Sequence, residues 1–303
     1  MRVVVTGATG TIGSAVVRAL ASRGDEPVAL TREAAKARGI LGTVETHAWQ
    51  EPAKGAPPAD ALRSAAAVIH LLGEPIAQRW TAEAKRDIRL SRVLSTRRLV
   101  AGIAANDTLP TLISQSATGY YGPHGDEWLT EDSPPGHDFL ADLVVDWERE
   151  AIAAPTGVRT VLARTGVVLS PEGGALSKML PPFRIGVGGP IAGGRQYLPW
   201  IHIDDVVGAL LHLVDTPAAT GAVNVVAPNP VTNAEMSAVL GHVLHRPAVM
   251  PVPAFAIRAM YGEMAATVLN GQRVSAAKLE GLGYIFAHTT FESSVRDVLQ
   301  AAA

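Results

Sequence analysis

Short apolar runs alternate with longer amphipathic stretches over the first 170 residues. The first run, Val3–Val5, has no polar member, which is typical of a strand buried on both faces of a parallel sheet. The next stretch, Thr11–Ser22, has the spacing of a helix. The same reasoning predicts further strands at Pro27–Leu30, Thr43–Trp49, Ala66–Leu72, Thr111–Ser116 and Arg159–Leu169, and long helices at Thr81–Ala105 and Phe139–Ala153. Strands that alternate with helices predict an α/β fold, a Rossmann-type doubly wound parallel sheet.

The rhythm changes after about residue 170, where glycine and proline pairs mark loops. Shorter elements follow at Asp204–Val214, Ala222–Val226 and Asn233–Leu244, and the tail after Pro253 is mostly helical. We therefore expect a Rossmann domain at 1–170, to which later segments such as 197–230 return. Residues 171–303 should form a smaller mixed, mainly helical C-terminal lobe.

A glycine-rich loop joins the first strand to the first helix. It reads Gly7-Ala-Thr-Gly10-Thr-Ile-Gly13, which is GxxGxxG. Glycine allows a tight turn and a close approach to a pyrophosphate, and the amide groups at the helix start face the phosphates. The strand–loop–helix context predicts a dinucleotide site. Its expected contacts are Gly7, Thr9, Gly10, Thr11, Ile12 and Gly13.

The second strand ends at Thr31-Arg32, where an NAD-preferring site would carry an acidic residue for the ribose. A hydroxyl and a guanidinium suit a 2′-phosphate, because arginine can pair with it bidentately. NADP(H) is therefore favoured over NAD(H). Glu33 is the opposing feature, since its carboxylate could reach the ribose instead.

Composition narrows the remaining classes of partner. The 303 residues carry a formal net charge of −2, so nothing favours nucleic acid or an anionic membrane. The chain has no cysteine, which excludes disulfides and thiolate ligands. The nine histidines show no HxH or HExxH spacing, so we expect no metal site. With no signal peptide and no run long enough to span a bilayer, we expect a cytoplasmic protein.

Several further motifs occur in a fixed order. They are LLGEPI at 71–76, SQSATGYYG at 114–122, RTGVVLSPEGGAL at 164–176, WIHIDDVV at 200–207, APNPVTNAE at 227–235, HRPAVMPVP at 245–253 and GQRV at 271–274. Together with TGATGTIG at 6–13, this set resembles the atypical extended short-chain dehydrogenase/reductases called epimerase family proteins. Members end in a C-terminal domain of unknown function. The resemblance implies an NAD(P)-binding fold and no assigned substrate.

The resemblance also implies cofactor contacts beyond the glycine loop, at the ends of strands and on the long helix. They are Leu71, Leu72, Gly73, Glu74, Asp87, Arg92, Ser114, Gln115, Arg164 and Val167. Carboxyl ends of strands are where this architecture binds ligands. For Asp87 and Arg92, a solvated, salt-bridging helix face is the alternative.

The catalytic pair of the wider superfamily, YxxxK on a helix, is absent from the chain. Phe139 and Leu143 occupy the corresponding positions, and neither can move a proton. Ser116 stands where the superfamily has its catalytic serine. Other candidates for orienting a reacting oxygen are Tyr120, Tyr121 and His202. Each has a structural alternative: a turn serine, packed aromatic rings, and a histidine beside a helix cap.

Two functions fit these observations. The first is an NADP(H)-dependent oxidoreductase or nucleotide-sugar-epimerase-like enzyme that acts on a small molecule. The second is a non-catalytic NADP(H)-binding redox sensor or regulatory module, which the missing tyrosine and lysine favour. The sequence alone assigns neither a substrate nor an oligomeric state.

Overall fold

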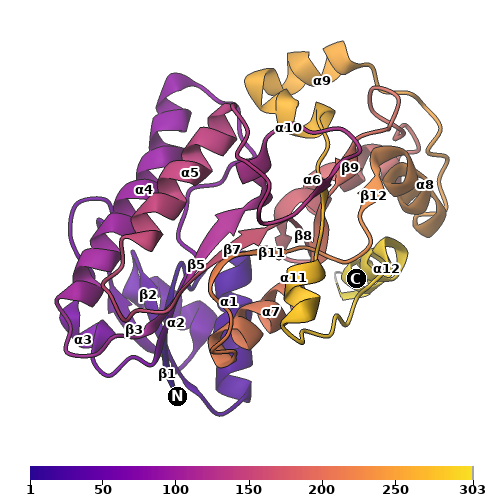
Figure 1. Cartoon of the computed structure of the whole chain (residues 1–303). Coiled ribbons are helices and arrows are strands. Elements are labelled where there is room, and N and C mark those ends of the chain that lie inside the picture. Colours follow the sequence, from indigo (N-terminus) through magenta and orange to yellow (C-terminus); the bar gives the residue numbers. More distant parts are fainter. Residues whose placement is uncertain (302–303) are drawn as a thin grey trace.

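A computed structural model of the protein describes residues 1–301. Its centre is a seven-stranded sheet in the order β11-β7-β5-β4-β1-β2-β3, and all six pairings are parallel (Figure 1). The strands are β1 (Arg2–Thr6), β2 (Glu26–Thr31), β3 (Glu45–Ala48), β4 (Ala67–His70), β5 (Thr111–Ala117), β7 (Thr160–Thr165) and β11 (Gly221–Val225). The strand order reverses between β1 and β4, so the fold class is confirmed as Rossmann-like.

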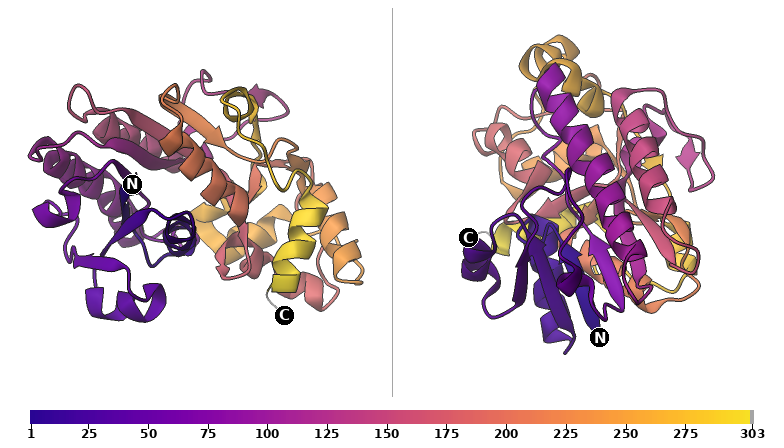
Figure 2. Two further views of the ribbon diagram at one scale, coloured as in Figure 1. Left: turned by 90° about the horizontal axis from the view of Figure 1, so that it is seen from below. Right: turned by 90° about the vertical axis from the view of Figure 1, so that its left-hand side faces the viewer.

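Helices cover both faces of this sheet. The side chains of β1 point alternately to the two faces, and those on both faces are apolar. Val3 and Val5 belong to a core shared with α1 (Thr11–Ser22) and α7 (Ile203–Asp215). Val4 belongs to a second core, formed with α3 (Ala59–Leu62) and α4 (Ala82–Ala104). The helix α5 (Phe139–Ile152) lies beside α4, as Figure 2 shows. The candidate site lies at the carboxyl ends of the strands, between these two layers of helices.

The C-terminal lobe packs around its own apolar core (Figure 1). That core includes Leu180, Trp200, Met236, Leu240 and Val295. The lobe contains α6 (Gly174–Arg184), β9 (Tyr197–Leu198), β12 (Val231–Thr232), α8 (Asn233–Val243), α9 (Ala254–Tyr261), η2 (Gly262–Met264), α10 (Ala265–Leu269) and α12 (Phe291–Ala301). Between these segments β11 returns to the central sheet beside β7.

Smaller elements complete the chain. They are α2 (Ala34–Leu41), η1 (Thr118–Tyr121), β6 (Trp128–Leu129), β8 (Val167–Ser170), β10 (Trp200–His202), β13 (Arg273–Val274) and α11 (Ala277–Gly281). The pairing of β13 with β6 ties the lobe to the loop after β5. No helix within residues 1–301 is both long and apolar enough to cross a membrane.

One predicted strand is wrong in extent. Arg159–Leu169 is not continuous, because the chain leaves the central sheet at Gly166 and β8 pairs with β10 instead. A Cβ atom at Gly166 would lie 2.2 Å from the carbonyl oxygen of Pro199. Only glycine permits this close approach, so the break is built into the sequence.

Candidate functional site

The carboxyl ends of four adjacent strands bring most of the predicted cofactor residues to one edge of the sheet. The glycine loop follows β1, Thr31-Arg32 ends β2, Leu71–Glu74 follows β4, and Ser114-Gln115 lies in β5. These segments are far apart in sequence. The parallel order of the sheet makes them neighbours, at the switch point where such folds bind ligands.

The three loop glycines have different structural roles. Gly7 has φ +64°, and a Cβ atom there would lie 2.9 Å from the Leu71 carbonyl oxygen. At Gly13 a Cβ atom would lie 2.2 Å from the Gly7 oxygen, so this glycine lets α1 pack on the loop. At Gly10 the nearest atom would be 3.3 Å away, and the residue is exposed. A side chain at Gly10 would press on the Gly7 oxygen and cover the exposed amino end of α1, where amide groups can meet phosphate.

Arg32 reaches across the crevice from β2. Its Nη1 lies 3.3 Å from the Glu74 carboxylate, and its side chain is 69% exposed. Thr31 beside it is buried. Such an exposed ion pair is weak, so the guanidinium is available for a stronger anion.

Of the two α4 residues, Arg92 contacts the segment after β4 and Asp87 is exposed. The Arg92 guanidinium occupies the space beside Gly73, where a Cβ atom would lie 2.8 Å from its Cζ. Burial lowers the pKa of Arg92 to about 10, against the opposing charge of Glu74. Asp87 is exposed and pairs with its neighbour Arg86 at 3.4 Å. Asp87 therefore fits the alternative, a solvated helix face.

A buried polar network lies behind β5 and β7. Arg164 donates to both carboxylate oxygens of Glu148, at 2.8 and 2.9 Å, and Ser116 donates to the same carboxylate. The Tyr121 hydroxyl donates to Asn224 at 2.6 Å, and burial raises the pKa of Tyr121 to about 12. Arg164 also lies 3.4 Å above the Tyr120 ring.

This network changes how four predicted residues are understood. Ser116, Tyr121 and Arg164 are buried with protein partners, and Tyr120 supports the guanidinium. A side chain held in this way serves the fold, and none of the four carries our proposed chemistry. Alternation along β5 directs the Ser116 side chain toward Glu148 on α5.

His202 also has a structural role. Its Nδ1 accepts a hydrogen bond from the Asp204 amide at 3.2 Å, which caps α7. The ring stacks on His288 with centroids 3.7 Å apart, and burial lowers the pKa of His202, with His288 acting in the same direction. The neighbouring Asp205 accepts bonds from the amides of Ala287 and His288. His202 thus joins α7 to the C-terminal segment.

The fold also gathers four potential metal ligands that the spacing did not predict. They are His202, Asp204, His288 and Asp297, with one donor atom from each within 4.8 Å of the others. A metal on Nε2 of His202 would require the proton on Nδ1, where the Asp204 amide already points. The tautomer that caps the helix therefore opposes metal binding through Nε2.

Phe139 and Leu143, at the start of α5, both pack against other parts of the protein. Phe139 packs edge-on against Trp80, with ring centroids 5.0 Å apart, and Leu143 is fully buried. Asp138 and Leu140, on either side of Phe139, line a cavity. Phe139 thus lies between two residues that line the cavity and is not itself part of the lining.

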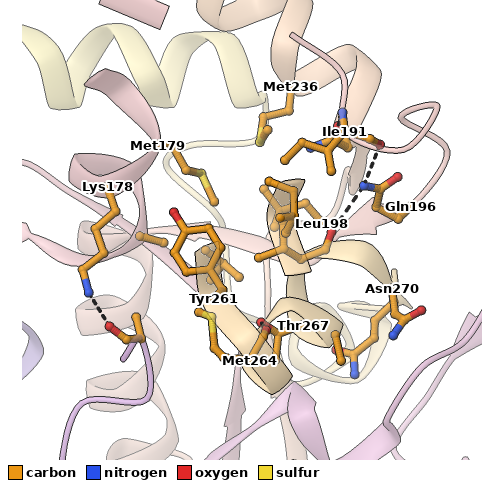
Figure 3. Close-up of a pocket in the computed structure, with 18 of the residues that line it drawn as sticks. Lys178, Met179, Ile191, Gln196, Leu198, Met236, Tyr261, Met264, Thr267 and Asn270 are labelled. Carbon is orange, nitrogen blue, oxygen red and sulfur yellow. Dashed lines mark hydrogen bonds between the residues drawn. The ribbon is translucent and has the colours of Figure 1, made fainter. Parts of the chain in front are cut away.

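That cavity has a volume of about 480 Å³ and lies between the carboxyl end of β5 and the C-terminal lobe (Figure 3). In the described part of the chain, its lining includes Val167, Thr118 and Gly119 but none of Ser116, Tyr120, Tyr121 and His202. Sequence reasoning missed Thr118. The signal was present, since Thr118 follows Ser116 by two residues at the end of a strand.

A doubly wound sheet with a glycine loop at its switch point defines a dinucleotide-binding protein of the α/β class. A family model described as "NAD dependent epimerase/dehydratase family" matches residues 3–226. A second, described as "Domain of unknown function (DUF1731)", matches residues 252–298. The chain belongs to the NAD-dependent epimerase/dehydratase family and carries this C-terminal domain, as the resemblance implied.

Its relatives include proteins of plants, animals and bacteria. The chain is 39% identical to "Epimerase family protein SDR39U1 homolog, chloroplastic" of Arabidopsis thaliana, covering 99% of this chain and 87% of that protein. The crystal structure of human epimerase family protein SDR39U1 (isoform 2) with NADPH matches at 34% identity, TM-score 0.89 and 99% of both chains. A nucleoside-diphosphate sugar epimerase from Corynebacterium glutamicum matches at 33% identity and TM-score 0.76, over 99% of this chain and 58% of that one.

Proposed function

We propose that the protein binds NADP(H) across the carboxyl ends of β1, β2, β4 and β5 and uses it as an oxidoreductase. The observation that carries the proposal is Arg32, an exposed guanidinium at the end of β2 where an NAD site would have an acid. The human relative crystallised with NADPH supports the same cofactor. The exposed amino end of α1 at Gly10 would receive the pyrophosphate.

When bound, NADPH supplies a hydride to a carbonyl carbon, and the carbonyl oxygen takes a proton from water. Thr118 lines the cavity at the end of β5, and its hydroxyl has no hydrogen-bond partner among the described residues. We assign it the role of orienting the reacting oxygen through a hydrogen bond. Replacing Thr118 with valine keeps the shape and removes that bond.

The test has two steps. Calorimetric titration with NADPH and NADH measures cofactor binding, and we expect NADPH to bind more tightly. NADPH oxidation with a panel of aldehydes and ketones then measures turnover, which Thr118→Val should lower by about 10- to 100-fold in kcat. Equal turnover by Thr118→Val and wild type would remove Thr118 from the mechanism.

A second function is favoured by one observation. Phe139 and Leu143 replace the proton-transfer pair, which fits a protein that binds NADP(H) and reports redox state to a partner. The same panel separates the two functions. A sensor would bind NADPH tightly and oxidise it with no carbonyl compound.

A further inference from the structure

The cavity beside the cofactor edge has an apolar wall. Figure 3 shows Met179, Met236, Leu198 and Met264 around one space, contributed by α6, α8, β9 and η2. Phe183 and Ile257 also belong to the lining. Methionine side chains adapt to irregular apolar shapes, so such a wall suits a hydrophobic ligand.

Most polar residues of the lining are already bonded to the backbone of the protein. Gln196 donates to the carbonyl oxygens of Ile191 and Val268, and Gln272 donates to that of Gly122. Further lining side chains accept from backbone amides: Asn233 from Ile191 and Asp138 from Ala141. These hydrogen bonds satisfy the polar groups within the protein and hold the walls in place.

The cavity also lacks the charge that a diphosphate needs. Within residues 1–301, the cavity lining contains a single lysine, Lys178, and no arginine. Its ammonium donates to the Ala77 carbonyl oxygen, as Figure 3 shows. A nucleoside diphosphate would place two negative charges against methionine and leucine side chains, at a high desolvation cost.

The helix α9, which contributes to the lining, also carries exposed apolar side chains. On α9, Phe255 and Met260 are 72% and 64% exposed, and Met260 also belongs to the lining. Exposed large apolar residues beside an apolar cavity favour the entry of a hydrophobic molecule from water.

We propose that the substrate is an uncharged, mainly apolar ketone or aldehyde, or the matching alcohol, and not a nucleoside diphosphate sugar. This rests on the proposed function. The apolar body of the substrate lies against Met179, Leu198 and Met236, and its carbonyl group lies at Thr118. NADPH is then the reductant and the carbonyl carbon is reduced, while water supplies the proton on oxygen.

Displacement of Nile red, an uncharged apolar dye, tests this without any turnover. Unbranched 2-alkanones from six to twelve carbons would compete with the dye, and UDP-glucose would be titrated in parallel. We expect each added methylene to tighten alkanone binding by about fourfold until the cavity is filled. UDP-glucose should displace no dye and give no calorimetric signal.

Charge variants locate the binding. Met264→Glu places a carboxylate in the wall and should weaken the longest alkanones by at least tenfold. Ile185→Glu adds the same charge to an exposed position of the lobe outside the lining and should leave alkanone binding unchanged. NADPH binding, measured on all three proteins, should be equal because the cofactor edge is untouched.

Each result bears on one proposal. Alkanones that bind without dependence on chain length, or equally well to Met264→Glu, would overturn the apolar substrate, as would tight binding of UDP-glucose. Failure of NADPH to bind would overturn the proposed function instead, and the dye experiment would still report on the cavity.

Discussion

Glu148 on α5 and Arg164 on β7 form a buried ion pair with two hydrogen bonds, of 2.8 and 2.9 Å. A buried pair of this kind contributes little net stability, yet removing one member leaves an uncompensated charge.

Glu148→Gln should therefore destabilise the protein by about 3–5 kcal/mol, because Arg164 stays buried and loses its counter-charge. Urea unfolding at pH 7 measures the change. Glu172→Gln is the matched control, since Glu172 pairs with Arg18 at the surface, 3.4 Å away, and its loss should change stability far less. Similar effects at both positions would contradict the structural role of the pair.

Two alanine substitutions should separate cofactor binding from folding. Gly10→Ala adds a methyl group at an exposed position, 3.3 Å from the Gly7 carbonyl oxygen, a contact that a small shift relieves. The fold should therefore persist while NADPH binding weakens by at least tenfold. Gly13→Ala forces a Cβ atom to 2.2 Å from the Gly7 oxygen, so it should lower the stability of the fold in addition to NADPH binding. Thermal unfolding and calorimetric titration of both variants check this. Unchanged NADPH affinity in a folded Gly10→Ala protein would refute the loop as the pyrophosphate site.

Arg32 and Glu74 should have opposite effects on cofactor choice. Arg32→Ala should weaken NADPH by about tenfold and leave NADH nearly unchanged, because only NADPH has the 2′-phosphate. Glu74→Gln removes the carboxylate that competes for Arg32 and should tighten NADPH binding modestly. An equal loss of both cofactors in Arg32→Ala would show that the arginine does not read the 2′-phosphate.

His70 should make stability depend on pH. It is fully buried, its Nδ1 lies 2.7 Å from the Thr6 hydroxyl and its Nε2 lies 2.9 Å from that of Thr96. Burial lowers the pKa of His70 to about 3. The unfolded chain binds the proton near pH 6.5, so this contribution to stability is present above pH 6.5 and is lost as pH falls toward 3.

Between pH 7 and pH 5, the wild type should lose about 2 kcal/mol more than His70→Asn. Urea unfolding at both values measures the difference. A wild-type NMR titration in which the His70 ring stays neutral at pH 5 would support it. Equal pH dependence of the two proteins would contradict the neutral buried histidine.

The sequence by itself determined the fold class and predicted which strand ends would bind the cofactor. The pattern of apolar residues in Val3–Val5 and Thr11–Ser22 indicates which positions are buried. Glycine at 7, 10 and 13 indicates where the backbone must turn tightly or be approached closely. Both signals are local, so they can be read along the chain. The absence of the tyrosine and lysine pair was equally plain at Phe139 and Leu143.

Only the tertiary structure decided what the polar side chains near the site do. Ser116 bonds to Glu148 and His202 caps α7, because partners distant in sequence meet each side chain there. Thr118 meets the cavity because the C-terminal lobe closes over the end of β5. The apolar wall, drawn from separate elements such as α6, α8 and η2, exists only once they pack together. Side-chain direction and contact depend on that packing, which no local pattern in the chain encodes.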